Sequence, residues 1–125
     1  MDKIAFRKDV KKSGHYSPGI ISQGMLYVSG QMPLHPDTAK LTVGIRAQSR
    51  HALQNLERVL EAAGVGRSAV VQCRVYLSDI GNWDVFNEVY AEFLGEHRPA
   101  RTVVPVSALH YGSLIEIEAI AEVEE

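Results

Sequence analysis

Two residues in the last quarter of the chain carry side chains suited to chemistry on a small carboxylate. Arg101 follows a Pro-Ala pair and precedes a β-branched run, and Glu116 lies in an alternating apolar and acidic stretch. An arginine fork binds a carboxylate through two parallel hydrogen bonds, and a glutamate can hold or activate a water. Together they suit a substrate with a carboxylate beside an electrophilic carbon. An ordinary ion pair between two strands accounts for the same residues.

The stretch that carries Glu116 has a period of two, which is typical of a β-strand. Residues 115–123 place apolar side chains on one face, and the other face carries Glu116, Glu118 and Glu122 with Ile120 among them. Residues 103–107 are predicted as another strand. If this strand and a strand over 114–123 are neighbours, Arg101 and Glu116 meet near one end of the sheet.

The rest of the chain is predicted to alternate strands with two helices. Strands are expected over 4–7, 20–23, 25–31 and 70–77, with a turn at Gly24. Helical periodicity covers 45–63, and a second helix runs from an N-cap at Asn82 to about residue 94. This order predicts an α+β fold with two helices on one face of a mixed sheet. The other face is then expected to be an assembly surface, to which Val28 and Ile120 contribute.

Composition and charge limit the classes of function. The chain has 125 residues, 46% of them hydrophobic and 22% charged, which is typical of one globular domain over 1–125. Its net charge of −2 gives no overall attraction to nucleic acid. No apolar stretch is long enough to span a bilayer, so no membrane partner is expected. The single cysteine, Cys73, fits a reducing compartment, and a cytoplasmic location is predicted.

The sequence contains no pattern for a metal or a cofactor. The five histidines lack the spacing of metal ligands, and phosphate loops, nucleophile elbows and dinucleotide fingerprints are absent. Cys73 lies among apolar neighbours in a predicted strand, which favours a buried, inert thiol over a nucleophile. Lys8, Lys11 and Lys12 form a basic patch with few aromatic residues nearby, interpreted as a solvated loop.

Several motifs, in order along nearly the whole chain, resemble those of one family. The segment P-A-R-T-V-V-P-V-S-A-L at 99–109 is followed, after a short spacer, by I-E-I-E at 115–118. Further matches are Y-S-P-G at 16–19, V-S-G-Q at 28–31 and F-N-E-V-Y-A-E-F at 86–93. Together they resemble the RidA/YjgF family of reactive-intermediate deaminases.

This resemblance implies a specific fold and reaction. The fold is a chorismate-mutase-like barrel, a homotrimer whose clefts lie between subunits. The reaction is hydrolysis of reactive 2-imino and 2-enamino acids, such as 2-aminoacrylate and 2-iminobutanoate, to 2-oxo acids and ammonia, with no cofactor. The alternatives are a non-catalytic module that binds a 2-oxo acid or amino acid, and an endoribonuclease or translation inhibitor, as some relatives are labelled.

The resemblance also implies roles for individual residues. Arg101 matches the arginine that binds the substrate carboxylate, and Glu116 matches the glutamate that positions or activates water. Five more positions match residues expected at the substrate: Tyr16, Ser29, Gly30, Asn87 and Val103. Each polar one has a plainer explanation: a packed loop aromatic for Tyr16, a strand-end hydroxyl for Ser29, and a contact between subunits for Asn87.

The chain departs from the common family pattern near the expected cleft. Val103 stands where many relatives have Cys or Thr, which excludes thiol chemistry there but leaves a backbone contact. His15 and Pro18 flank Tyr16 where many relatives have Pro and Gln, and His110 replaces a frequent proline. These changes are expected to reshape the mouth of the pocket and so to alter the substrate range.

Overall fold

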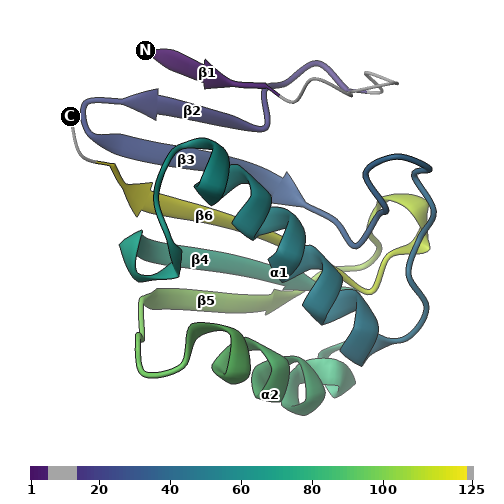
Figure 1. Cartoon of the computed structure of the whole chain (residues 1–125). Helices are drawn as coiled ribbons and strands as arrows, with labels where there is room; N and C mark the ends of the chain where they lie inside the picture. Colours follow the sequence, from purple (N-terminus) through teal and green to yellow (C-terminus); the bar gives the residue numbers. More distant parts are fainter. Residues whose placement is uncertain (6–13, 124–125) are drawn as a thin grey trace.

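The computed structural model describes residues 1–5 and 14–123, and in them one six-stranded sheet carries two helices on one face (Figure 1). The strands are β1 (Asp2–Ile4), β2 (Gly19–Ser22), β3 (Met25–Gln31), β4 (Val70–Leu77), β5 (Ala100–Pro105) and β6 (Ile115–Glu122). The helices are α1 (Ile45–Ala62) and α2 (Trp83–Leu94). The predicted α+β architecture is therefore confirmed.

The order of the strands differs from the chain order in one important way. Across the sheet the order is β1-β2-β3-β6-β4-β5, and only the β4–β5 pair is parallel. Helix α2 provides the crossover that a parallel pair needs. Strand β4 therefore separates β5 from β6. The expectation that the strands carrying Arg101 and Glu116 are direct neighbours is wrong, because sequence periodicity does not report strand order.

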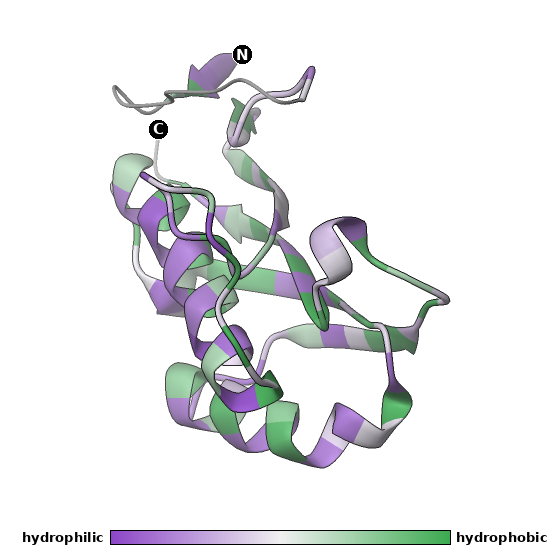
Figure 2. Cartoon of the chain, turned by 90° about the vertical axis from the view of Figure 1, so that its right-hand side faces the viewer, coloured by the Kyte–Doolittle hydropathy of each residue, from purple (hydrophilic) through white to green (hydrophobic). Residues whose placement is uncertain are grey.

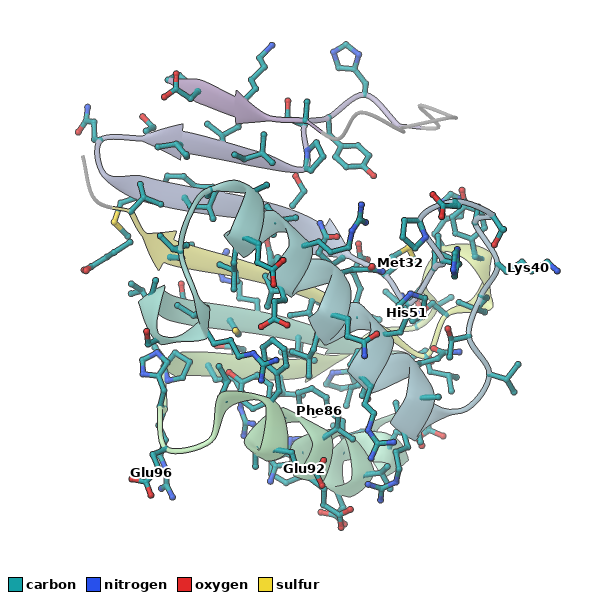
Figure 3. All side chains as sticks on the ribbon, viewed as in Figure 1. Met32, Lys40, His51, Phe86, Glu92 and Glu96 are labelled. Carbon is teal, nitrogen blue, oxygen red and sulfur yellow. The ribbon has the colours of Figure 1, made fainter. Side chains whose placement is uncertain are left out.

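The core lies between the sheet and the helices. Ile115, Ile117 and Ala119 of β6 are buried there, as their alternation with acids predicts. Phe86 points from α2 toward the sheet, whereas Glu92 of the same helix points away (Figure 3). Seen from the side, α1 lies on one side of the sheet and presents mostly hydrophilic residues outward (Figure 2). Both α1 and α2 lie on this one face of the sheet (Figure 1); we call the other face the open face.

Two local irregularities correct the sequence-based assignment. A register shift between Val70 and Gln72 turns Val71 outward, where it is 40% exposed, although its spacing is that of the buried Cys73 and Val75. Val28 is buried under the helices opposite Ala119 and does not belong to the open face. Ile120 does lie on that face and is half-buried.

The bounds of the elements also differ by a few residues. Strand β5 begins earlier than the predicted 103–107 and includes Arg101, because it follows β4 in parallel register from Gln72 onward. Asn82 does precede α2, but its side chain makes no capping hydrogen bond; Asp79 instead accepts from the Gly81 amide. Strand β1 begins before the predicted strand at 4–7 and shares only Ile4 with it. The end of that predicted strand and the predicted lysine patch lie outside the described residues.

Buried polar side chains of α1 fix the long loop between β3 and α1. The Asn55 amide donates to the backbone oxygens of Met32 and Leu34 at 2.8 and 3.0 Å. Gln48 donates to the Thr42 oxygen and accepts from the Leu114 amide, which also ties the loop before β6. Figure 3 shows His51 of α1 beside this loop. These contacts hold an irregular segment in place without a strand partner for most of its length.

We expect Asn55→Ala to lower the free energy of unfolding by about 2 kcal/mol, because two partly buried carbonyls lose their donor. Urea unfolding followed by circular dichroism measures the change. Gln54→Ala, at the exposed neighbouring position of α1, is the matched control, and it should change the free energy by less than about 0.5 kcal/mol. Equal effects of the two substitutions would contradict this anchoring role.

Candidate functional site

The Arg101 side chain lies on the helix side of the sheet, at its β5 edge. Parallel register places Arg101 beside the buried Cys73, so both side chains point toward α2. The Arg101 Nη1 donates to the Asn87 Oδ1 at 2.8 Å. Its carbon Cζ lies 4.9 Å from the centre of the Tyr90 ring. The rings of Trp83 and Phe86 are 5.5 and 6.0 Å away.

This environment orients a cation while leaving it able to bind an anion. Aromatic faces attract a guanidinium without using its N–H donors. Within residues 14–123, no carboxylate lies within ion-pair distance of Arg101, and Asn87 is its one side-chain hydrogen-bond partner. Most of its donors are therefore available to a ligand. A planar carboxylate is the group that best matches such a fork.

A groove of about 540 Å³ begins at Arg101 and follows the second half of α2. Its walls include Asn87, Tyr90, Leu94, His97 and Pro99. The loop that forms one wall leaves α2 at Gly95, whose φ of 63° favours glycine. His97 Nε2 lies 2.7 Å from the Val70 oxygen and ties this loop to β4. The size is within the range of roughly 300–1,000 Å³ that small-molecule sites have.

Glu116 occupies the open face, above β3. Its carboxyl group lies against Gly30: a Cβ atom added to that glycine would overlap Oε2 and stand 3.0 Å from Cδ. Any larger residue at this position would displace the carboxyl group. Gly30 thus acts by leaving room for Glu116, which is a contact that the V-S-G-Q motif alone did not indicate.

The surroundings of Glu116 favour its protonated form. Burial raises the pKa of the Glu116 carboxyl, the neighbouring charge of Glu118 raises it further, and His110 partly opposes both. A carboxylate with a raised pKa is a better proton acceptor from water than an ordinary surface glutamate. The half-buried side chain of Glu116 is therefore suited to general base chemistry.

Arg101 and Glu116 do not meet within one chain. Arg101 points toward α2, whereas Glu116 lies between the buried Ile115 and Ile117 of β6 and so points to the open face. Strand β4 also lies between their strands. The ion pair considered from the sequence is therefore absent from the described chain. Any reaction that needs both groups needs a second subunit or a large rearrangement.

The other predicted residues lie at two separate places. Asn87 belongs to the Arg101 cluster. The side chain of Val103 lies on the same face of β5 as that of Arg101 and packs against the core. Ser29 lies away from this cluster, on β3. Its hydroxyl donates to the Ser17 backbone oxygen at 2.6 Å, and its amide donates to the Pro18 backbone oxygen. Tyr16 is 66% exposed on the loop that Ser29 holds.

Cys73 and Tyr90 lie behind the guanidinium. Both side chains are buried, and burial is the main reason why the pKa of the Cys73 thiol and that of the Tyr90 phenol are raised. Both groups are thus neutral at physiological pH. This agrees with the expectation of an unreactive thiol, since the thiolate is the nucleophilic form.

Some residues of the site were not found from the sequence. The rings of Trp83, Phe86 and Tyr90 all face Arg101. The helical spacing of Phe86 and Tyr90 predicts only positions on the core-facing side of α2, and no motif indicates Trp83. On the open face, the Tyr76 hydroxyl donates to the Glu118 Oε1. In the sequence, Tyr76 alternates with the apolar residues Val75 and Leu77, which indicates this face, but only the pairing of β4 with β6 brings it to Glu118.

Neither a metal-binding cluster nor a membrane-spanning helix is found in the part of the chain that is described. Residues 1–5 and 14–123 contain no cluster of three or more His, Cys, Asp or Glu side chains placed to hold a metal ion. Neither of the described helices has the length and apolar character needed to cross a membrane.

Known proteins similar to this chain fall in one family. The family model described as Endoribonuclease L-PSP matches residues 6–123. A RutC family protein of Pyrococcus horikoshii is 42% identical over 123 residues, covering 97% of this chain and 98% of its own length. The human protein named 2-iminobutanoate/2-iminopropanoate deaminase is 37% identical over 109 residues, covering 86% of this chain and 80% of its own.

A solved structure gives the same result for the fold. The crystal structure of RidA from an Antarctic Psychrobacter superposes with a TM-score of 0.92 at 35% identity, covering 98% of this chain and all of that one. The similarity extends over both the Arg101 cluster and the open face. The chain therefore belongs to the RidA/YjgF family, the family of the Endoribonuclease L-PSP model.

Proposed function

We propose that this protein hydrolyses short 2-imino acids, such as 2-iminopropanoate and 2-iminobutanoate, to 2-oxo acids and ammonia in the cytoplasm. The observation that carries the proposal is the Arg101 guanidinium, fixed by Asn87 and aromatic rings at one end of a groove with its donors available. The name of the human relative, a 2-iminobutanoate/2-iminopropanoate deaminase, supports the same chemistry.

In this proposal Arg101 binds the substrate carboxylate and orients the C=N carbon beside it. A water attacks that carbon while Glu116 takes one of its protons, which gives a carbinolamine. Glu116 then returns the proton to the amino group, the C–N bond breaks, and ammonia leaves. The ionised Glu116 accepts the hydroxyl proton of the intermediate as the carbonyl forms, and the released ammonia takes this proton up as ammonium. No cofactor is required, because the protonated imine is already electrophilic.

The proposal includes a homotrimer in which each site is shared between two subunits. Arg101 lies at the β5 edge and Glu116 on the open face, so one chain presents the two halves in different directions. A cyclic arrangement that docks the edge of one subunit near the open face of the next would join them. Ser29 would hold the loop that carries Tyr16, and the exposed Tyr16 ring would reach the ligand in the shared cleft.

A second candidate, cleavage of RNA, is kept because the matching family model carries the description Endoribonuclease. The net charge of −2 gives no general attraction to phosphate backbones. Ribonuclease activity that co-purifies with the protein and disappears in Arg101→Ala would favour this candidate. Binding of 2-oxobutanoate by calorimetry, without any acceleration of imine hydrolysis, would instead favour a binding module.

We expect Arg101→Ala to lower kcat/KM for imine hydrolysis by about a hundredfold or more, because the substrate loses its orienting contact. Arg101→Lys should also be impaired, since an ammonium cannot form the paired contact. The assay generates imines in situ from amino acids of increasing side-chain size and follows the loss of imine. Arg50→Ala, which removes an exposed arginine of α1, is the control and should behave as wild type. Near-normal turnover by Arg101→Ala would refute the mechanism.

Mixed assemblies test whether each site is shared. Arg101→Ala and Glu116→Gln should each be inactive alone, and refolding them together should restore about a quarter of the wild-type activity, because random assembly joins an intact Arg101 to an intact Glu116 at that fraction of the interfaces. Activity should also fall as subunits dissociate on dilution. Failure of complementation, or a fully active monomer in sedimentation, would contradict the shared site.

A further inference from the structure

A polar network on the open face connects β4 to β6. The Tyr76 hydroxyl donates to the Glu118 Oε1, and the Arg74 Nη1 lies 4.0 Å from the same oxygen. Antiparallel register explains the arrangement: Arg74 stands opposite Glu118, and Tyr76 stands opposite Glu116. Glu118 is thus held by a neutral donor and a cation, whereas Glu116 makes no hydrogen bond or ion pair with the described residues.

The network makes the two acids unequal. Tyr76 and Arg74 hold the Glu118 carboxylate at a fixed place on the open face, beside Glu116. That fixed negative charge disfavours a second one at Glu116, two residues along the same face. The charges that act on Glu116 are those of Glu118 on β6 and of His110 in the short helix His110–Gly112. On β4, Tyr76 stands opposite Glu116 and Arg74 opposite Glu118. The facing residue of β3 is Gly30, which adds no charge.

We propose that Tyr76 is a positioning residue for Glu116 and acts through Glu118. This inference rests on the proposed function. By fixing the Glu118 carboxylate on the open face, Tyr76 keeps its negative charge close to Glu116, which favours the protonated form of Glu116. Glu116 is then the group that takes a proton from the attacking water and returns it to the departing amine. Tyr76 touches neither the substrate nor the water.

A purely structural pair would behave differently. Side chains of Arg74 and Glu118 are 53% and 34% exposed, and an exposed pair of this kind contributes little to folding. Loss of the Tyr76 hydroxyl would then change thermal stability slightly and leave the pH dependence of the reaction as it was. The pH profile therefore separates the two interpretations.

The decisive variant is Tyr76→Phe, which removes the hydroxyl and keeps the ring. Without this donor the Glu118 side chain is free to move away from Glu116, so its charge raises the pKa of Glu116 less, and Glu116 stays ionised to lower pH and becomes a weaker base. We expect the acid limb of kcat/KM to move by about half a pH unit or more to lower pH, with about a two- to tenfold loss of kcat/KM on the plateau. Glu118→Gln should move the limb in the same direction.

The double variant tests the route of the effect. Tyr76→Phe should cause no further shift in a Glu118→Gln background, because Tyr76 acts only through that carboxylate. The control is Tyr27→Phe, since Tyr27 is another tyrosine of the open face, 48% exposed on β3. It should leave the acid limb in place. An unshifted limb in Tyr76→Phe, or an additive shift in the double variant, would overturn the proposal.

A readout without turnover keeps this test independent of the proposed reaction. Carboxyl groups labelled with ¹³C report the titration of Glu116, assigned by its loss in Glu116→Gln. The midpoint for Glu116 should fall in Tyr76→Phe and remain unchanged in Tyr27→Phe. If the wild-type protein hydrolyses no imine, the proposed function fails, and the midpoints still decide whether Tyr76 controls Glu116. Unchanged midpoints in an active enzyme would refute the positioning role alone.

Discussion

The alternation of side chains along a strand controls how this molecule can perform chemistry. Successive residues of a strand point to opposite faces of the sheet, so the strands that bury an apolar residue under the helices expose its neighbour on the open face. The side chain of Arg101 lies on the helix-covered face, like that of Cys73, whereas the side chain of Glu116 lies on the open face. The two groups are therefore separated by the sheet itself. A shared site between subunits is a geometric consequence if both groups act on one substrate.

Much of the fold follows from local patterns that the sequence displays openly. The apolar stripe of α1 and the alternation of β6 gave the correct element types and nearly correct bounds, because each pattern reports burial against one neighbour. The C-terminal motif then identified the family, and the comparisons confirm that assignment. The candidate residues were found in the same way, through motifs and not through any visible geometry.

Apart from a missing helix cap at Asn82 and small shifts of element bounds, the errors concern relations between elements. Periodicity cannot show that β4 lies between β5 and β6, and so the sequence placed Arg101 and Glu116 on neighbouring strands. A bulge changes the phase of a strand, which is why Val71 faces outward. The sequence does not predict the aromatic surroundings of Arg101, because the spacing of Tyr90 and Phe86 is equally typical of core residues on an amphipathic helix. Each of these points depends on which strands and helices lie next to each other in the fold. A single sequence does not show these long-range contacts.

If the open face is a subunit interface, as proposed, its polar side chains affect the free energy of assembly. Covering a face that carries Glu116, Glu118 and Arg74 removes water from charged groups, which opposes association. Two features reduce this cost. Ile120 and Tyr27 contribute apolar area to the same face, and Glu118 already has two partners within its own chain. Glu116 remains the group whose charge association penalises most. An interface that contains such an acid is less stable than an apolar one. A role for Glu116 in deprotonating a water molecule would be a physical reason for an acid at this position.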